Sequence, residues 1–132
     1  MIVDTSAVIE FLRGTGSVVD HRLAQGLKAG DALYLPSVVI QEVLQGARNA
    51  SEFVRLQIQM DHLPLFEPED VHELHRQAAL LYARCRWQGL TVRSPIDCIV
   101  AACALEADMP LLARDRDFAA IAHIEPNLKL IS

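Results

Sequence analysis

The sequence has few of the features that mark secreted or membrane-spanning proteins. It contains three cysteines in 132 residues, with neither a CxxC pair nor a zinc-finger spacing. Such cysteines are typical of free thiols in a reducing compartment. The longest uninterrupted apolar run, residues 98–105, is far shorter than the roughly 18 residues that a membrane span requires. No basic stretch precedes an apolar segment at the start, so we expect no signal peptide and a cytoplasmic protein.

Aromatic residues are also scarce, at 5% of the chain, although hydrophobic residues make up 52%. We therefore expect a core built mainly from aliphatic side chains and alanine. The length is that of one ordinary domain, and neither a repeat nor a low-complexity tract divides it. The sequence predicts a single domain over residues 1–132.

Short apolar runs alternate with longer segments in which apolar residues recur at helical spacing. The predicted strands are residues 1–3, 32–35, 64–66, 110–112 and 128–131. The predicted helices are residues 7–13, 18–29, 38–48, 51–62, 69–88, 95–107 and 116–122. This alternation predicts an α/β fold with a mainly parallel sheet and helices on both faces. Reactive groups in such a sheet gather beyond the carboxyl ends of the strands, near the point where strand order reverses.

Two acidic residues follow predicted strands and are expected at that edge of the sheet. Asp4 directly follows the first apolar run, and Asp115 follows the fourth run by three residues. Each also has a purely structural interpretation. Asp4 could cap the first helix, and Asp115 and Asp117 could belong to a turn and a cap.

Two further acids are predicted to lie on helices. Asp97 stands three residues after Ser94 and opens a helix with Pro95 in its first position, which is a capping-box pattern. The rest of that helix is apolar on all sides and is predicted to be buried, so the carboxylate needs backbone N–H groups or a cation as its partner. Glu42 lies on a partly apolar helix face, where a solvated glutamate would give the same pattern.

Carboxylates that share one sheet edge repel one another and destabilise the fold unless a cation lies among them. Mg²⁺ and Mn²⁺ suit such a site, because they are held by a few carboxylates and water. Either ion can activate water and stabilise the oxygens of a phosphodiester during hydrolysis. The overall charge of −5 argues against a nucleic-acid partner. However, five acids in one metal site would leave 12 others, which the 12 lysines and arginines balance.

The order of these motifs resembles that of the PIN domain, in its VapC-type toxin branch. The resemblance rests on residues 1–6 (MIVDTS), Glu42, Asp97 with Ala101 and Ala102, and residues 111–118 (LLARDRDF). It spans nearly the whole chain. It implies a three-layer α/β/α sandwich around a five-stranded, mainly parallel sheet.

The resemblance also implies a function. The chain would be an endoribonuclease that uses Mg²⁺ or Mn²⁺ and cleaves RNA, with tRNA or rRNA loops as targets. It would be the toxin of a type II toxin-antitoxin pair, inhibited by a cognate antitoxin, and a homodimer within a larger complex. The catalytic acids would be Asp4, Glu42, Asp97 and Asp115, and the metal ligands would be Asp4, Asp97, Asp115 and Asp117.

One position departs from the family pattern. Ala113 stands where the family commonly has Thr or Ser, whose hydroxyl can orient a carboxylate or a metal-bound water. That role would fall to Thr5 or Ser6. Arg114 and Arg116, beside the proposed ligands, are predicted to bind phosphate or to orient the acids near them.

Other features have weaker functional interpretations. Arg84, Arg86 and Arg93 surround Trp87 and could bind RNA through charge and stacking, although surface arginines and a packed tryptophan explain the same residues. His72 and His75 could bind zinc, but they are one residue short of the HExxH spacing, and an exposed helix face is favoured.

Two other functions remain open at this stage. The first is a catalytically silent PIN-like module that only binds a partner. The second is a phosphohydrolase with Asp4 as its nucleophile. That second function ranks lower, because the second acid it requires is replaced by Ser6.

Overall fold

The computed structural model describes residues 1–131, while Ser132 and the side chain of Asp115 lie outside the described part. Five short strands and seven helices alternate along this part of the chain. The strands are β1 (Ile2–Val3), β2 (Leu35–Pro36), β3 (Leu65–Phe66), β4 (Leu111–Leu112) and β5 (Leu130–Ile131). The helices are α1 (Thr5–Arg13), α2 (Val18–Ala29), α3 (Ser37–Gln45), α4 (Ala50–Met60), α5 (Val71–Trp87), α6 (Pro95–Ala107) and α7 (Asp115–Ile124).

The strands pair in parallel throughout. β4 lies between β1 and β5, and β2 pairs with β3. Tyr34, just before β2, joins the two groups, because it forms a parallel bridge with Ile2 and its carbonyl accepts the Val3 N–H at 3.1 Å. The resulting order, β3-β2-β1-β4-β5, reverses between β1 and β4. In open parallel sheets, this reversal creates a crevice at the carboxyl ends of the two strands.

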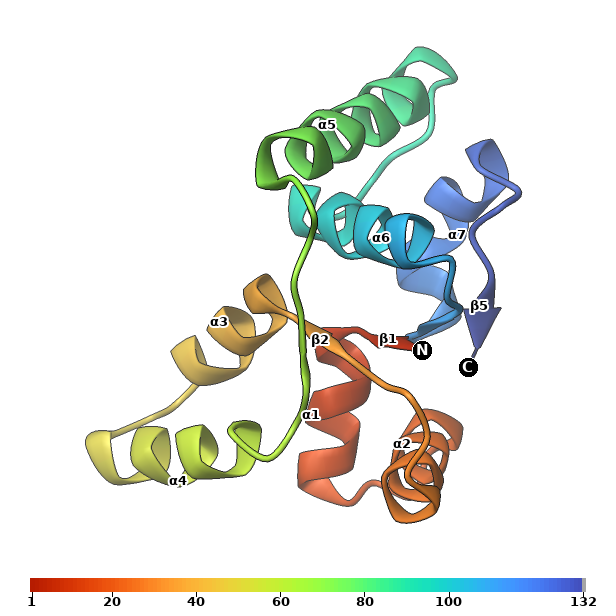
Figure 1. Cartoon of the computed structure of the whole chain (residues 1–132). Helices are drawn as coiled ribbons and strands as arrows, with labels where there is room; N and C mark the ends of the chain where they lie inside the picture. The colour runs from red at the N-terminus through yellow and green to blue at the C-terminus, as the bar shows by residue number, and fades with distance from the viewer. Residues whose placement is uncertain (132) are drawn as a thin grey trace.

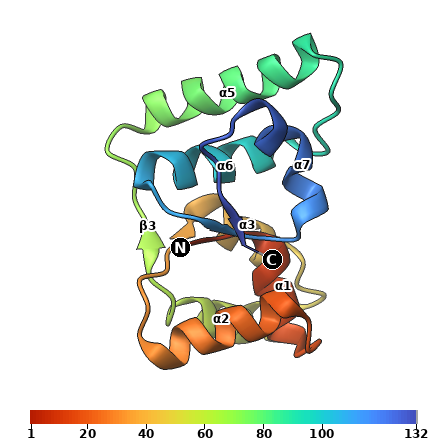
Figure 2. The same ribbon diagram turned by 90° about the vertical axis from the view of Figure 1, so that its right-hand side faces the viewer.

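Helices cover both faces of the sheet, as Figures 1 and 2 show. α5, α6 and α7 lie on one face, and α1 and α2 lie on the other. α3 and α4 extend to one side of the sheet, and we call residues 37–60 the α3–α4 arm. This architecture confirms the predicted three-layer α/β/α sandwich with a parallel sheet.

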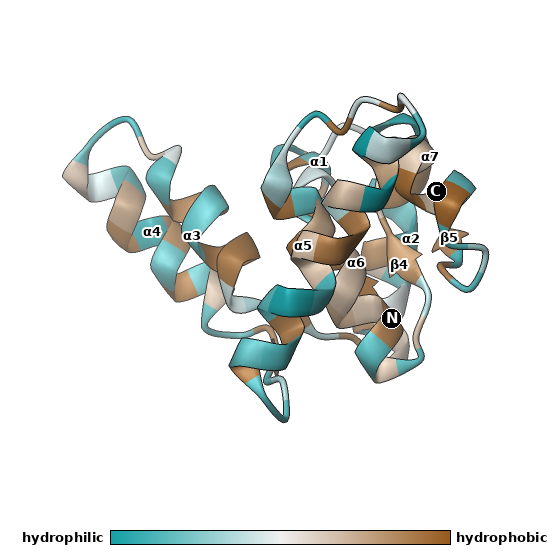
Figure 3. Cartoon of the chain, turned by 90° about the horizontal axis from the view of Figure 1, so that it is seen from above, coloured by the Kyte–Doolittle hydropathy of each residue, from teal (hydrophilic) through white to brown (hydrophobic). Residues whose placement is uncertain are grey.

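The core lies around α6, between the sheet and α5. The helix is apolar on every side, as its brown ribbon in Figure 3 shows, and Val100 is fully buried. The three cysteines are also buried and unpaired. Burial raises the pKa of the Cys98 and Cys103 thiols to about 12, so both remain protonated and unreactive near neutral pH. None of the helices in the described residues is long and apolar enough to cross a membrane.

Two of the helices begin at a position other than the predicted one because a side chain caps them. The first helix was expected from residue 7 but begins at Thr5, because the Asp4 carboxylate accepts the Ser6 N–H. The fifth helix was expected from residue 69 but begins after Asp70, whose carboxylate accepts two backbone N–H groups. Each strand is also shorter than its apolar run.

A candidate acidic active site at the strand reversal

Asp4 lies where the strand order reverses. It follows β1 directly, and its backbone N–H donates to the carbonyl of Leu112, at the end of β4, at 3.0 Å. Asp4 is 5% exposed, and its Oδ2 accepts the Ser6 N–H at 3.0 Å and the Ser6 hydroxyl at 2.6 Å. Burial raises the pKa of Asp4, and the charge of Glu42 raises it further, while the Ser6 hydrogen bonds act in the opposite direction. Asp4 therefore caps α1 and is also a buried acid at the crevice.

Glu42 reaches the same region from α3. The Thr5 hydroxyl donates to Glu42 Oε1 at 2.6 Å, and the glutamate is half-buried. The freely solvated glutamate considered from the sequence is therefore wrong. The first two residues of α1 hold two acids that are 38 residues apart in the chain, because Thr5 binds Glu42 and Ser6 binds Asp4.

Asp97 lies in the first turn of α6. Its N–H donates to the Ser94 carbonyl at 3.1 Å, while the Ser94 hydroxyl accepts the Ile96 N–H at 3.2 Å. Among the described residues, no side chain or backbone group donates a hydrogen bond to the Asp97 carboxylate. Capping the helix therefore does not explain this side chain.

Burial and neighbouring acids raise the pKa of Asp97 to about 7. Burial has the largest effect, followed by the negative charges of Asp4, Asp117 and Glu42, and the charge of Arg93 acts in the opposite direction. Since these charges act on one carboxyl group, the structure brings four of the five predicted acids into electrostatic reach of one another. The Asp115 backbone begins α7 close by, but its side chain lies outside the described residues.

Asp117 has a partner that the sequence did not indicate. Arg93 Nη1 lies 3.1 Å from Asp117 Oδ1, which ties the segment before α6 to the first turn of α7. Arg93 was considered only as an RNA contact, and no spacing in the sequence links it to Asp117. The Arg114 guanidinium lies 3.9 Å from Glu10, and Arg116 is exposed.

Ser6 supplies a hydroxyl near the position where Ala113 lacks one. Ala113 is buried, and the next residue, Arg114, donates its backbone N–H to Ser6 Oγ at 3.2 Å. Ser6 Oγ in turn donates to Asp4. This pair of hydrogen bonds links the segment after β1 to the segment after β4.

The donor set fits a hard divalent ion that retains much of its water. All five acids are oxygen donors, whereas the cysteines are buried in the core. Among the described residues, no group of three or more acidic, histidine or cysteine side chains is arranged to hold a metal ion. Mg²⁺ needs no such group, because one or two carboxylates and water molecules complete its coordination. An open arrangement of acids in electrostatic reach is compatible with this mode of binding.

Three residues outside the acidic site were considered for RNA or zinc binding, and the structure shows what surrounds each of them. Arg84 donates to the Ile124 carbonyl at 2.5 Å and lies 3.8 Å from Glu125, so its guanidinium holds α5 against α7. Trp87 is 74% exposed, so the interpretation of a packed tryptophan is wrong. His75 Nδ1 lies 2.8 Å from the Val71 carbonyl, which makes that nitrogen a donor and not a metal ligand.

The family model for the PIN domain matches residues 1–124. The chain belongs to the PIN domain family. It is 35% identical over 127 residues to VapC ribonuclease Mb1587 of Mycobacterium bovis, covering 94% of this chain and 92% of that protein. Ribonuclease VapC11 of Mycobacterium tuberculosis matches to the same extent.

Two solved structures share the fold of this PIN domain. VapBC-1 from nontypeable Haemophilus influenzae superposes with a TM-score of 0.75 at 17% identity, covering 99% of this chain and 96% of that one. VapBC-5 from Mycobacterium tuberculosis, a member of the VapBC family of toxin-antitoxin systems, superposes with a TM-score of 0.67 at 20% identity, covering 98% and 95%. At these identities the likeness establishes the fold alone.

Replacing Ser6 by Ala in this PIN domain is expected to lower the free energy of unfolding by about 1–2 kcal/mol at neutral pH, because Asp4 loses a hydrogen bond to its ionised form. For the same reason, the pKa of Asp4 is expected to rise further. Chemical denaturation measures the first effect, and NMR titration of the carboxyl carbon measures the second. Ser51→Ala, at an exposed position in α4, is the control and should leave both quantities unchanged. An unaltered Asp4 pKa in Ser6→Ala would contradict the role given to this hydroxyl.

Proposed function

We propose that this PIN domain is a metal-dependent endoribonuclease and the toxin of a toxin-antitoxin pair. The observation that carries the proposal is that Thr5 and Ser6, adjacent residues of α1, hold Glu42 and the buried Asp4 at the strand reversal. Burial and the charges of Asp4, Asp117 and Glu42 also raise the pKa of Asp97 to about 7. Crowded carboxylates without a compensating cation destabilise a fold, so a protein retains them where they bind one. The VapC ribonucleases that match most of the chain support RNA as the substrate.

The proposed roles combine the family resemblance with the contacts of the acids that the structure describes. Asp4, Asp97, Asp115 and Asp117 would hold Mg²⁺ or Mn²⁺, and Glu42 would act with them in catalysis. When bound, the ion supplies an activated water and neutralises charge that develops on the phosphodiester. Glu42 Oε1 accepts the Thr5 hydroxyl, which leaves Oε2 to accept a proton from the attacking water. Ser6 fixes Asp4, and Arg93 fixes Asp117.

The proposed partners are RNA and a cognate antitoxin. Sequence-specific RNA recognition mostly uses unpaired loops, where a flexible strand can enter a recessed site, so loops of tRNA or rRNA are the expected targets. The VapBC structures that share this fold support a cognate antitoxin as a partner. We propose that it covers the acidic site. We also propose a homodimer within the toxin–antitoxin complex.

Cleavage assays with controlled divalent ions test this function directly. The purified protein is incubated with total tRNA in EDTA, and then with Mg²⁺ or Mn²⁺ in excess. We expect no cleavage in EDTA and defined fragments with either cation. Equal cleavage in EDTA would exclude the metal mechanism. Ribosomal RNA is tested in the same way, and absence of cleavage of both RNAs with every divalent ion would favour the catalytically silent binding module. Release of phosphate from small phosphoesters, with RNA left intact, would instead favour a phosphohydrolase.

A further inference from the structure

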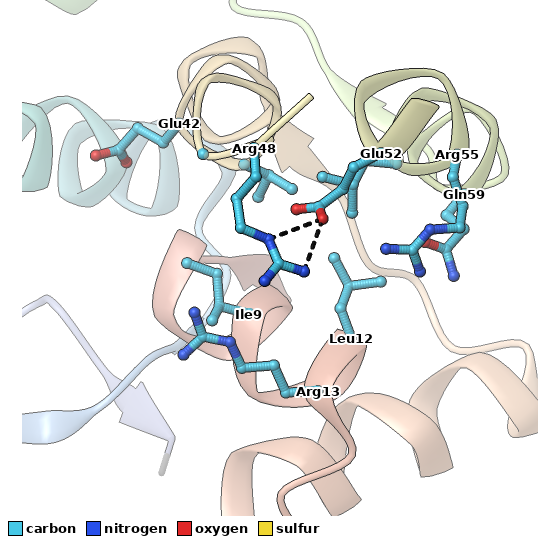
Figure 4. Close-up of a pocket in the computed structure, with 11 residues that line it drawn as sticks. Ile9, Leu12, Arg13, Glu42, Arg48, Glu52, Arg55 and Gln59 are labelled. Atoms are coloured by element: carbon cyan, nitrogen blue, oxygen red, sulfur yellow. Dashed lines mark hydrogen bonds and ion pairs between the residues drawn. The ribbon is translucent and has the colours of Figure 1, made fainter. Parts of the chain in front are cut away.

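A pocket of about 390 Å³ opens beside the acidic site, between α1 and the α3–α4 arm. Figure 4 shows this pocket, with Glu42 at one end. Glu42 is also one of the acids whose charge raises the pKa of Asp97. Glu42 therefore belongs both to the lining of the pocket and to the acidic site, although its carboxylate points away from the arginines in Figure 4.

Three arginines line the pocket, one from each of its walls. In Figure 4, Arg13 reaches in from α1, Arg48 from the segment between α3 and α4, and Arg55 from α4. Arg48 donates from Nε and Nη2 to Glu52 Oε2, at 3.1 and 3.0 Å. Arg13 and Arg55 are exposed, and within the described residues neither forms an ion pair. Two guanidinium groups are thus available to an anion.

The charges of the chain explain why a basic pocket is needed next to the acids. The net charge is −5, and the acidic centre repels the phosphates of an approaching RNA strand. Positive groups beside the centre must therefore hold the strand while one phosphodiester lies at the acids. Guanidinium groups suit this role because their paired N–H donors match two phosphate oxygens. Apolar side chains between them, Ile9 and Leu12 of α1 and Leu56 of α4, offer contacts to the sugars.

We propose that this pocket, which we call the arginine pocket, binds the phosphate backbone of single-stranded RNA next to the cleaved bond. Arg13 and Arg55 contact phosphates, while the charge of Arg48 is balanced by its ion pair with Glu52. The inference rests on the proposed ribonuclease function and adds the surface that the substrate follows. Since backbone contacts carry no base information, this binding is independent of sequence and depends strongly on salt.

The double variant Arg13→Gln/Arg55→Gln tests the arginine pocket. Binding of a fluorescein-labelled oligouridylate is measured in EDTA by fluorescence anisotropy over a range of salt concentrations. The double variant is expected to raise Kd about tenfold. It is also expected to reduce the slope of log K against log salt by about 1.4, the value for two lost contacts to a single strand. Both residues are exposed, so the variant should fold, and circular dichroism with thermal melting checks this.

The matched control is Arg22→Gln/Lys28→Gln on α2, which removes the same charge from two exposed residues outside the pocket. It should change Kd by less than twofold. Equal binding by the pocket variant and the unaltered protein would overturn the inference, as would an equal loss in both double variants. Normal RNA binding with lost antitoxin binding would assign the pocket to a protein partner and overturn the inference too. Cleavage by the unaltered protein with Mn²⁺ is measured in parallel. If only the proposal for the arginine pocket is wrong, the unaltered protein still cleaves RNA. If the proposed ribonuclease function is wrong, the unaltered protein does not cleave RNA.

Discussion

Replacing Asp97 by Asn is expected to reduce RNA cleavage by roughly a thousandfold or more while the protein remains folded. The substitution keeps the size of the side chain but removes a negative charge that interacts with those of Asp4, Asp117 and Glu42. Loss of a charged metal ligand removes several kcal/mol of transition-state stabilisation. Single-turnover cleavage of a labelled RNA at saturating Mg²⁺ measures the effect.

Asp108→Asn provides the matched control for this variant. Asp108 is exposed and caps the opposite end of α6, so the same chemical change occurs on the same helix but away from the acids. Its cleavage rate should equal that of the unaltered protein. A folded Asp97→Asn protein that cleaves RNA at the normal rate would show that Asp97 has no part in the chemistry.

Without divalent cations, the free energy of unfolding is expected to decrease as the pH rises from about 4 to about 7. The pKa of Asp97 rises from its usual 3.8 to about 7 in the folded protein. Between these values the folded protein retains a proton that the unfolded chain has lost, so stability present at low pH is lost as the pH rises through this window. Because the carboxyl is partly exposed and solvent screens it, we expect a loss of about 1–2 kcal/mol. The raised pKa of Asp4 acts in the same direction.

Mg²⁺ or Mn²⁺ should restore this stability above pH 7, since binding to the folded state alone stabilises it. Thermal melting at several pH values, with EDTA or with Mn²⁺, measures both effects. Histidines and other acids also titrate in this range, so the informative quantity is the difference between the unaltered protein and Asp97→Asn. We expect the variant to be more stable at pH 8 in EDTA and to gain less from Mn²⁺. Identical pH profiles and identical Mn²⁺ effects in the two proteins would contradict the account.

The sequence predicted the fold well because the apolar pattern of this chain alternates cleanly. Each two-residue strand lies within or overlaps a predicted apolar run, and α6 was expected to be buried from its composition alone. The boundaries were less accurate because capping depends on individual hydrogen bonds. The Asp4 carboxylate, for example, starts α1 two residues before the first apolar position of the predicted helix.

The candidate site was predictable only in part. Parallel strands place their carboxyl ends together, so Asp4 was expected at the strand reversal, where the structure places it. The partners of the acids were not expected, because the Thr5–Glu42 hydrogen bond and the Arg93–Asp117 ion pair join residues 37 and 24 positions apart with no spacing rule. The arginine pocket also needed the structure, since its walls come from three separate segments and depend on how the α3–α4 arm folds against α1.

A structure of the protein crystallised with Mn²⁺, with anomalous diffraction recorded to locate the ion, tests most directly whether the acids share one cation. We predict an anomalous peak at the carboxyl ends of β1 and β4, with oxygens of Asp4 and Asp97 within coordinating distance. That peak should be absent from Asp97→Asn crystals grown under the same conditions. An empty crevice at saturating Mn²⁺, or an ion bound only elsewhere on the molecule, would contradict the account.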